Sequence, residues 1–107
     1  MYNFIIHFNQ TKTKAEIVDR IAKQTGIEKN TVIAVVETFM ESVKNSMIAG
    51  EKVFLRGFGS FIIKRKAQKT GRNISSNTTV IIPAHSVPAF KPAKTFRDMV
   101  KEGIKAK

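Results

Sequence analysis

The sequence predicts an α+β fold with a two-helix N-terminal hairpin, a three-stranded antiparallel sheet bearing a long protruding β-arm, and a short C-terminal helix. Three observations favour it. Apolar residues recur at helical spacing up to about residue 49, short β-rich segments bounded by glycines follow Glu51, and a polar, basic stretch separates two of these segments. We expect residues 1–12 to be an N-terminal extension and residues 13–107 a single domain, with the arm at about 64–82.

Two helices are expected first. Thr13 and Glu16 form a capping box, in which the threonine side chain accepts from an amide of the first turn and the glutamate reaches back. The first helix should therefore cover about 14–25, with Gly26 providing its left-handed end. A second helix is predicted at about 29–49, because its apolar residues form one broad stripe.

The rest of the chain predicts strands, the arm and a last helix. Strands are expected at residues 52–55, 60–65, 78–82 and 87–90. The polar stretch that carries Gly71-Arg72-Asn73 should form the tip of a hairpin. Pro83 and Pro88 interrupt the returning strand, which suits a sheet edge and not its centre. Pro92 then precedes a helix that should reach about Lys105.

Charge divides the chain into two parts. The sequence holds 19 Lys and Arg against 8 Asp and Glu, a net charge of +11. Residues 1–51 are balanced, whereas residues 52–97 contain basic side chains and no carboxylate. Cations concentrated in this way indicate a polyanionic partner. Lys64 and Lys66 alternate onto one face of a strand, and Lys69 and Arg72 should continue this track along a ribbon narrow enough for a groove.

Other classes of function find little support. The absence of cysteine excludes thiol chemistry and fits a reducing compartment, and no apolar run is long enough to span a bilayer. His7 and His85 lack a second ligand at metal spacing, and no catalytic constellation or phosphate-binding loop is present. We therefore expect no enzyme activity, cofactor, metal, small-molecule substrate or membrane partner, and a cytoplasmic location.

Three sets of residues occur in a fixed order, namely Gly57-Phe58-Gly59, Gly71-Arg72-Asn73 and Val87-Pro88-Ala89-Phe90-Lys91-Pro92. With them, the stretch from Thr13 to Lys101 resembles the HU/IHF family of bacterial histone-like DNA-bending proteins. The resemblance implies an intertwined homodimer whose two basic β-arms embrace double-stranded DNA from the minor groove and bend or compact it in the nucleoid. A heterodimer with a paralogue is the alternative for the second chain.

The resemblance also assigns site residues. Ile74 stands where the family usually has a proline, and it is apolar enough to serve as the wedge between base steps. Arg65 stands where many relatives carry an acidic residue. The DNA-binding residues implied are Lys64, Arg65, Lys66, Lys69, Arg72, Asn73, Lys91 and Lys94.

A second chain is also expected from the small size of the core. A polar arm cannot pack on a core of its own, so it must project into solvent. The residues that are left outside the arm are few for burying a long amphipathic helix and several phenylalanines. We therefore expect a dimer, in which a second chain covers this apolar surface, because two-fold dimers are the commonest assembly. The dimer core should contain Val36, Phe39, Met40, Val43, Phe58 and Phe61.

Several interpretations compete with non-specific DNA bending. One is a site-specific bending factor of the IHF type. A helix-turn-helix regulator is disfavoured because the second helix has no net charge, with Lys29 and Lys44 offset by Glu37 and Glu41. An RNA-binding or ribosomal protein would need aromatic residues for stacking, which the arm lacks. A membrane-surface protein would carry its charge on an amphipathic helix.

Overall fold

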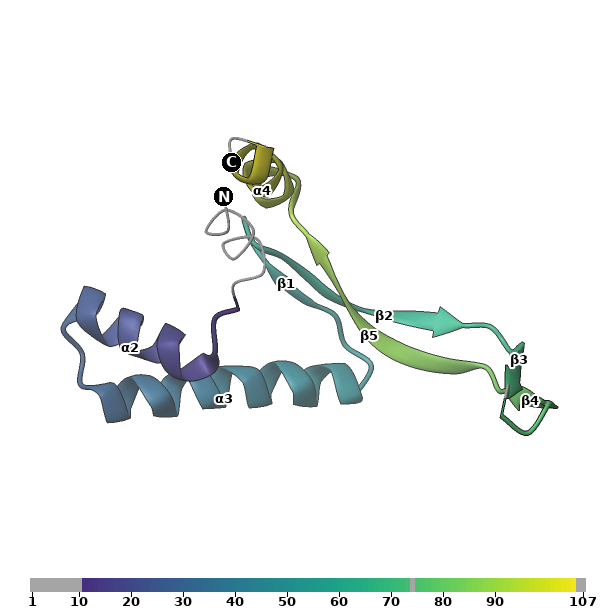
Figure 1. Cartoon of the computed structure of the whole chain (residues 1–107). Helices are drawn as coiled ribbons and strands as arrows, with labels where there is room; N and C mark the ends of the chain where they lie inside the picture. The colour runs from purple at the N-terminus through teal and green to yellow at the C-terminus, as the bar shows by residue number, and fades with distance from the viewer. Residues whose placement is uncertain (1–10, 74, 106–107) are drawn as a thin grey trace.

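A computed structural model describes residues 11–73 and 75–105. Two helices come first, followed by strands and a last helix, as predicted (Figure 1). Most of the N-terminal extension and Ile74 lie outside the described residues. The elements are α2 (Lys14–Thr25), α3 (Lys29–Ile48), β1 (Val53–Leu55), β2 (Gly59–Lys66), β3 (Lys69–Asn73), β4 (Thr78–Ile82), β5 (His85–Pro92) and α4 (Lys94–Lys105).

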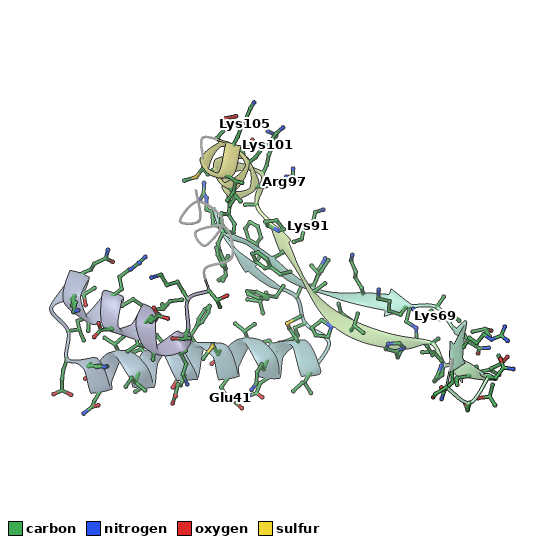
Figure 2. All side chains as sticks on the ribbon, viewed as in Figure 1. Glu41, Lys69, Lys91, Arg97, Lys101 and Lys105 are labelled. Carbon is green, nitrogen blue, oxygen red and sulfur yellow. The ribbon has the colours of Figure 1, made fainter. Side chains whose placement is uncertain are left out.

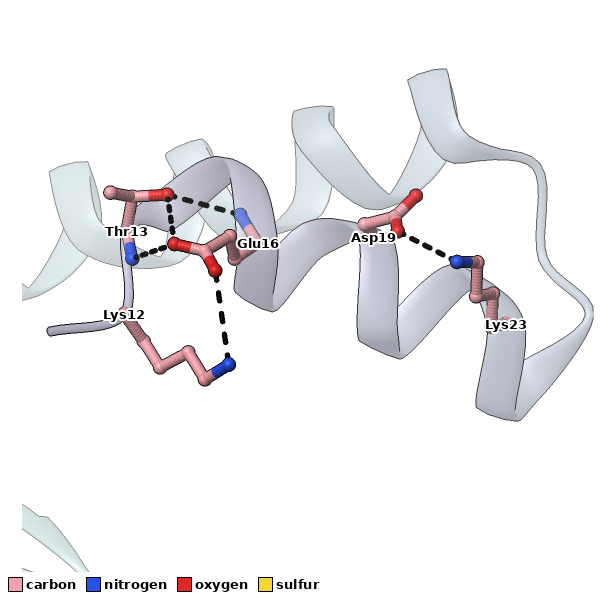
Figure 3. A network of polar contacts seen from close by, with 5 residues as sticks. All are labelled: Lys12, Thr13, Glu16, Asp19 and Lys23. Carbon is pink, nitrogen blue, oxygen red and sulfur yellow. Dashed lines mark hydrogen bonds and ion pairs between the residues drawn. The ribbon is translucent and has the colours of Figure 1, made fainter. Parts of the chain in front are cut away.

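The start of α2 is fixed by local hydrogen bonds. The backbone N–H of Glu16 donates to Thr13 Oγ1 at 3.3 Å, and the N–H of Thr13 donates to Glu16 Oε1 at 3.2 Å (Figure 3). Both halves of the predicted capping box are therefore present. At the other end, Gly26 adopts the left-handed conformation (φ 74°), and its N–H donates to Ala22 O. The helix boundaries predicted from these residues are confirmed.

Helices α2 and α3 pack against each other as an antiparallel pair (Figure 1). Val18 and Val32, one from each helix, are the buried apolar side chains of the described residues, at 2% and 4% exposure. Lys14 Nζ also contacts Glu37 Oε2 at 2.7 Å across the pair. The two helices are thus held together by a small buried apolar contact and by an ion pair between exposed side chains.

The body sheet has the order β1-β2-β5 and is antiparallel. Strand β5 is an edge strand, and for this reason it can include Pro88, which pairs with Ile63. A cluster of phenylalanine rings packs on one face of the sheet. The ring centroids of Phe58 and Phe61 each lie 5.0 Å from that of Phe90, and those of Phe58 and Phe96 lie 5.4 Å apart, which ties α4 to the sheet.

The outer part of the arm is more regular than the sequence indicated. Residues 69–73, expected at an irregular tip, form strand β3, which pairs with β4 from Lys69↔Ile82 to Asn73↔Thr78. The prediction of Gly71-Arg72-Asn73 at the tip is therefore wrong; the described turn residues are 75–77. Backbone pairing needs no apolar side chains, which explains why hydrophobic periodicity missed this strand. Breaks at 67–68 and 83–84 separate the outer hairpin, β3/β4, from the β2/β5 ribbon (Figure 1).

A single chain leaves much of its apolar surface uncovered. Its accessible surface is 9144 Å², whereas a compact chain of 12.0 kDa exposes about 6,000 Å². Its radius of gyration is 19.2 Å, against about 13 Å for a compact domain of this length. The projecting arm contributes to both differences. Exposed apolar side chains on the helices contribute too, among them Val35, Phe39, Met40 and Ile48.

Gly59 allows β2 and β5 to approach closely. A Cβ at this position would lie 2.6 Å from Lys91 O and 2.7 Å from Phe90 Cζ, so the backbone of β5 or the ring cluster would have to shift. We predict that Gly59→Ala lowers the free energy of unfolding by about 1–3 kcal/mol, the usual cost of overpacking. Urea unfolding of wild type and variant at the same protein concentration measures this change in the free energy of unfolding.

Gly103→Ala is the matched control, because a Cβ at Gly103 in α4 meets nothing within 4 Å. The added methyl group should leave stability unchanged or raise it by up to about 1 kcal/mol through helix propensity. Equal stabilities of the two variants would contradict the packing role of Gly59.

The capping box should make stability depend on pH. Hydrogen bonds from the backbone and side chain of Thr13, with a contribution from the Lys12 ammonium, hold the pKa of the Glu16 carboxyl below its usual range. A lowered pKa in the folded state stabilises the protein above the unfolded pKa of about 4.3 and loses this effect as the pH falls through the folded pKa. Unfolding measured against pH should therefore show Glu16→Gln less stable than wild type near neutrality, with the gap closing in acid. A gap that stays constant would contradict this role.

Candidate nucleic-acid interface

Ion pairs gather on the helical part of the described chain. Five of the six join side chains of residues 12–44, and the sixth joins Lys94 to Asp98 at 2.8 Å. The lysines of residues 12–44 thus have carboxylate partners close by, while the stretch 52–97, which holds the sheet and the arm, contains no carboxylate. The five helical pairs are Lys12–Glu16, Lys14–Glu37, Lys23–Asp19, Lys29–Asp19 and Lys44–Glu41.

The register of β2 and β5 places three lysines on one face of the ribbon. Side chains directly opposite in an antiparallel pair share a face, and those two residues apart on a strand do too. Lys64 and Lys66 therefore share a face with Lys91, which pairs with Ser60. Phe61 and Phe90, which pair with each other, lie on the opposite face. The lysine-bearing face is thus turned away from the aromatic cluster.

Arg65 lies on the face of the ribbon opposite to Lys64 and Lys66. Its register partner is Ser86, and its Nη1 lies 3.5 Å from Ser86 Oγ. Cations therefore occupy both faces of the ribbon where it leaves the body.

The outer hairpin repeats this two-sided arrangement. Lys69 and Arg72 are an odd number of residues apart on β3, so they project from opposite faces, and the expectation of one continuous track is wrong. Both side chains are exposed. Arg72 Nη2 donates to Asn77 Oδ1 at 2.6 Å, across the turn. Asn77 has φ 54°, a left-handed conformation that asparagine tolerates, so it shapes the turn and positions Arg72.

The side chain of Asn73 forms hydrogen bonds within the turn of the outer hairpin. Its Oδ1 accepts from Ser75 Oγ at 2.8 Å and from the N–H of Ser76 at 3.4 Å. These bonds hold the backbone beside Ile74, whose own position lies outside the described residues. The amide of Asn73 thus links the end of β3 to the serines of the turn.

Two of the predicted DNA-binding residues, Lys91 and Lys94, lie near the body sheet, and only one of them has a carboxylate beside it. Lys91 is exposed on the outward face of β5, whereas the ammonium of Lys94 is held by Asp98. Sequence reasoning did not single out Asn77 or the cations that follow Lys94 on α4. The signals in the sequence were an asparagine, a residue that tolerates left-handed backbone, after two serines, and a four-residue spacing of basic residues.

The residues predicted for a dimer core are incompletely covered in one chain. Phe39, Met40 and Phe58 are 46%, 40% and 44% exposed. Val36, Val43 and Phe61 are half-buried. An apolar set of this kind, spread over α3 and the sheet, is typical of an interface.

Within the described residues, no helix is long and apolar enough to cross a membrane. The same part of the chain holds no group of three potential metal-ligating side chains.

The sequence profile of the bacterial DNA-binding protein family matches residues 12–101. The chain belongs to this family. Similar relatives include the DNA-binding protein HU of Thermus thermophilus, 39% identical over 87% of this chain and 96% of its own length. The DNA-binding protein HU of Thermotoga maritima is 38% identical over 83% of this chain and 99% of its own length.

Solved structures of family members have the same fold. A cocrystal structure of Anabaena HU with DNA matches with a TM-score of 0.80 and 37% identity, covering 83% of this chain and 97% of that one. HU from Thermotoga maritima matches with a TM-score of 0.61 and 30% identity, covering 83% and 98%. The family membership confirms the resemblance found in the sequence.

Proposed function

We propose that this protein is an architectural DNA-binding protein, which grips the minor groove with two basic β-arms and bends or compacts the duplex. One observation carries the proposal: a projecting ribbon without a carboxylate bears cations on both faces, in a member of a bacterial DNA-binding family. The role is structural and not catalytic, and it would associate the protein with the nucleoid.

Cations on both faces of the arm are favourable for a ribbon that lies in a groove of DNA. A ribbon inserted between two phosphate-lined walls meets negative charge on both sides, so cations on both of its faces can each approach a strand. Lys64, Lys66 and Lys69 would meet phosphates in this way, together with Arg65 and Arg72. Such contacts carry no sequence information. We therefore infer binding that is largely independent of sequence, with any preference coming from the deformability of DNA.

Two chains are needed for two arms. The exposed faces of α3 and the phenylalanine cluster support a homodimer in which a second copy covers Phe39, Met40 and Phe58. Homodimers with cyclic two-fold symmetry are the commonest assembly, and obligate interfaces are strongly apolar. A two-fold axis would place the arms on opposite sides of one duplex.

Bending should depend on Ile74. An apolar side chain at the arm's end can enter between base steps and unstack them, whereas proline would in addition fix the backbone of the tip. In the described residues, Asn73 accepts hydrogen bonds from Ser75 and Ser76 of the turn. The phosphate contacts and the wedge are separate contributions, so they can be tested apart.

Removing arm cations should weaken the salt dependence of DNA binding. We expect Lys64→Gln/Lys66→Gln to flatten the slope of log K against log salt by about 0.9 for each phosphate that is no longer neutralised. Lys12→Gln/Lys23→Gln removes as many cations from residues that face carboxylates, and it should change the slope little. Fluorescence anisotropy on a random duplex at several salt concentrations measures both.

Equal slopes for the two double variants would contradict binding through the arms. Parallel titrations with structured RNA and with anionic vesicles test the competing classes of partner. Tighter binding to RNA or to vesicles than to nicked or pre-bent DNA would overturn the proposed function.

Changing Ile74 should separate bending from affinity. We predict that Ile74→Ala reduces the bend angle more than the affinity, because the phosphate contacts remain. Ile74→Pro keeps an apolar tip and serves as the comparison. Electrophoretic bending assays on random and easily kinked sites give both quantities, and a parallel decrease of bending and affinity would argue against a wedge.

A further inference from the structure

We propose that Asn77 is a specificity-determining residue of the arm, which orients the guanidinium of Arg72 so that the two side chains together favour A·T over G·C base pairs in the minor groove. Arg72 lies on β3, and Asn77 ends the turn that follows this strand. Arg72 Nη2 donates to Asn77 Oδ1 at 2.6 Å. The inference rests on the proposed function, and it adds a contact with base edges to the phosphate contacts of the ribbon.

The outer hairpin leaves both side chains open to a ligand. It lies at the far end of the ribbon from the helices, with Lys69 at the start of β3 (Figure 2). Arg72 and Asn77 are both exposed. A hydrogen bond between exposed side chains contributes only modestly to stability, because water can replace either partner. Its main effect is to restrict the rotamers of a long, flexible arginine before DNA is bound.

The backbone fixes the position of the Asn77 carboxamide. Asn77 has φ 54°, a left-handed conformation that glycine and asparagine adopt more readily than other residues. It lies two residues before Thr79, the register partner of Arg72, which brings the two side chains to the same side of the hairpin. Glycine would satisfy the same turn, but it would not supply the oxygen atom to which Arg72 donates.

The acceptor is neutral, which preserves the charge of Arg72. No carboxylate occurs between residues 52 and 97, and none of the ion pairs in the described chain includes Arg72. A carboxylate would hold the guanidinium more tightly, but it would also cancel the charge and compete with DNA for it. The carboxamide orients the guanidinium and leaves its positive charge for the negative potential of a narrow minor groove.

The pair presents hydrogen-bond donors to the groove. Asn77 Oδ1 is turned toward Arg72, so the Nδ2 group, which is a donor, lies on the other side of the carboxamide. The guanidinium has further N–H donors and no acceptor. The hydrogen bond thus fixes which way the carboxamide faces, and the side directed away from Arg72 is the donor side.

A surface of donors discriminates between base pairs in the minor groove. A·T and T·A pairs present only acceptors there, adenine N3 and thymine O2, whereas a G·C pair adds the exocyclic amino group of guanine, which is a donor. At a G·C pair this amino group would face the donors of Arg72 and Asn77, and both sides would lose water without gaining a partner. Discrimination therefore arises from an unfavourable contact with G·C as well as from a favourable contact with A·T.

Duplexes that differ in a single minor-groove group test this role. Inosine in place of guanine removes the amino group, and diaminopurine in place of adenine adds one. Wild type should bind an inosine·C duplex about two- to tenfold more tightly than the matching G·C duplex, which is the range for one net hydrogen bond. Diaminopurine should weaken binding to an A·T duplex by a similar factor.

Asn77→Gly keeps the left-handed turn and removes the carboxamide, so both affinity ratios should fall toward one while the salt slope stays unchanged. Any part of a ratio that comes from DNA deformability remains in this variant, so the decrease measures the contribution of the carboxamide. Asn77→Asp still accepts from Arg72 but lacks the Nδ2 donor, and it should lose the ratios as Asn77→Gly does.

Ser76→Ala is the matched control, because Ser76 lies in the same turn and its Oγ contacts Thr78 Oγ1 at 2.7 Å. This variant should keep the ratios of wild type. Wild-type ratios in Asn77→Gly, whether or not its overall affinity falls, would show that the contact with Arg72 only shapes the turn and would overturn the role of Asn77. Failure of wild type to bind any of the duplexes would instead overturn the proposed function.

Discussion

The structure depends on one constraint, the inability of a single chain to bury its own apolar residues. The two-helix hairpin buries Val18 and Val32, while Phe39 and Met40 on α3 stay exposed. Burial of apolar area is the main source of stability, so a chain with this little core needs a partner surface. In the proposed dimer, a second copy would supply that surface and would also bring a second arm.

The division of charge follows from the same arrangement. The helical part neutralises itself through short-range pairs such as Lys14–Glu37, so it can pack against a second chain without repulsion. The strands and the arm keep their cations apart from carboxylates, and the nearest compensating charge is then an external one. One part of the chain is thus built for association with itself and the other for association with a polyanion.

Local signals in the sequence predicted much of the fold. The capping box of Thr13 and Glu16 and the glycine at position 26 gave the bounds of α2, because these features act over a single turn. Strand β3 was missed because its pairing is made by backbone groups and its side chains show no apolar alternation. The close approach at Gly59 depends on β5, which is distant along the chain, so no local pattern could reveal it.

The sequence indicated which basic residues the arm carries, but it predicted less well the faces and contacts that those residues have in the structure. Lys64 and Lys66 were placed on one face correctly from strand periodicity. Lys69 and Arg72 lie three residues apart within β3, so they project from opposite faces. The contact between Arg72 and Asn77 required the shape of the turn.

Sedimentation equilibrium of the protein, alone and on a short duplex, tests the central claim most directly. We expect twice the chain mass of 12.0 kDa in the free state over the whole accessible concentration range, and two chains per duplex in the complex. A folded monomer of 12.0 kDa, or a complex saturated by one chain, would contradict it.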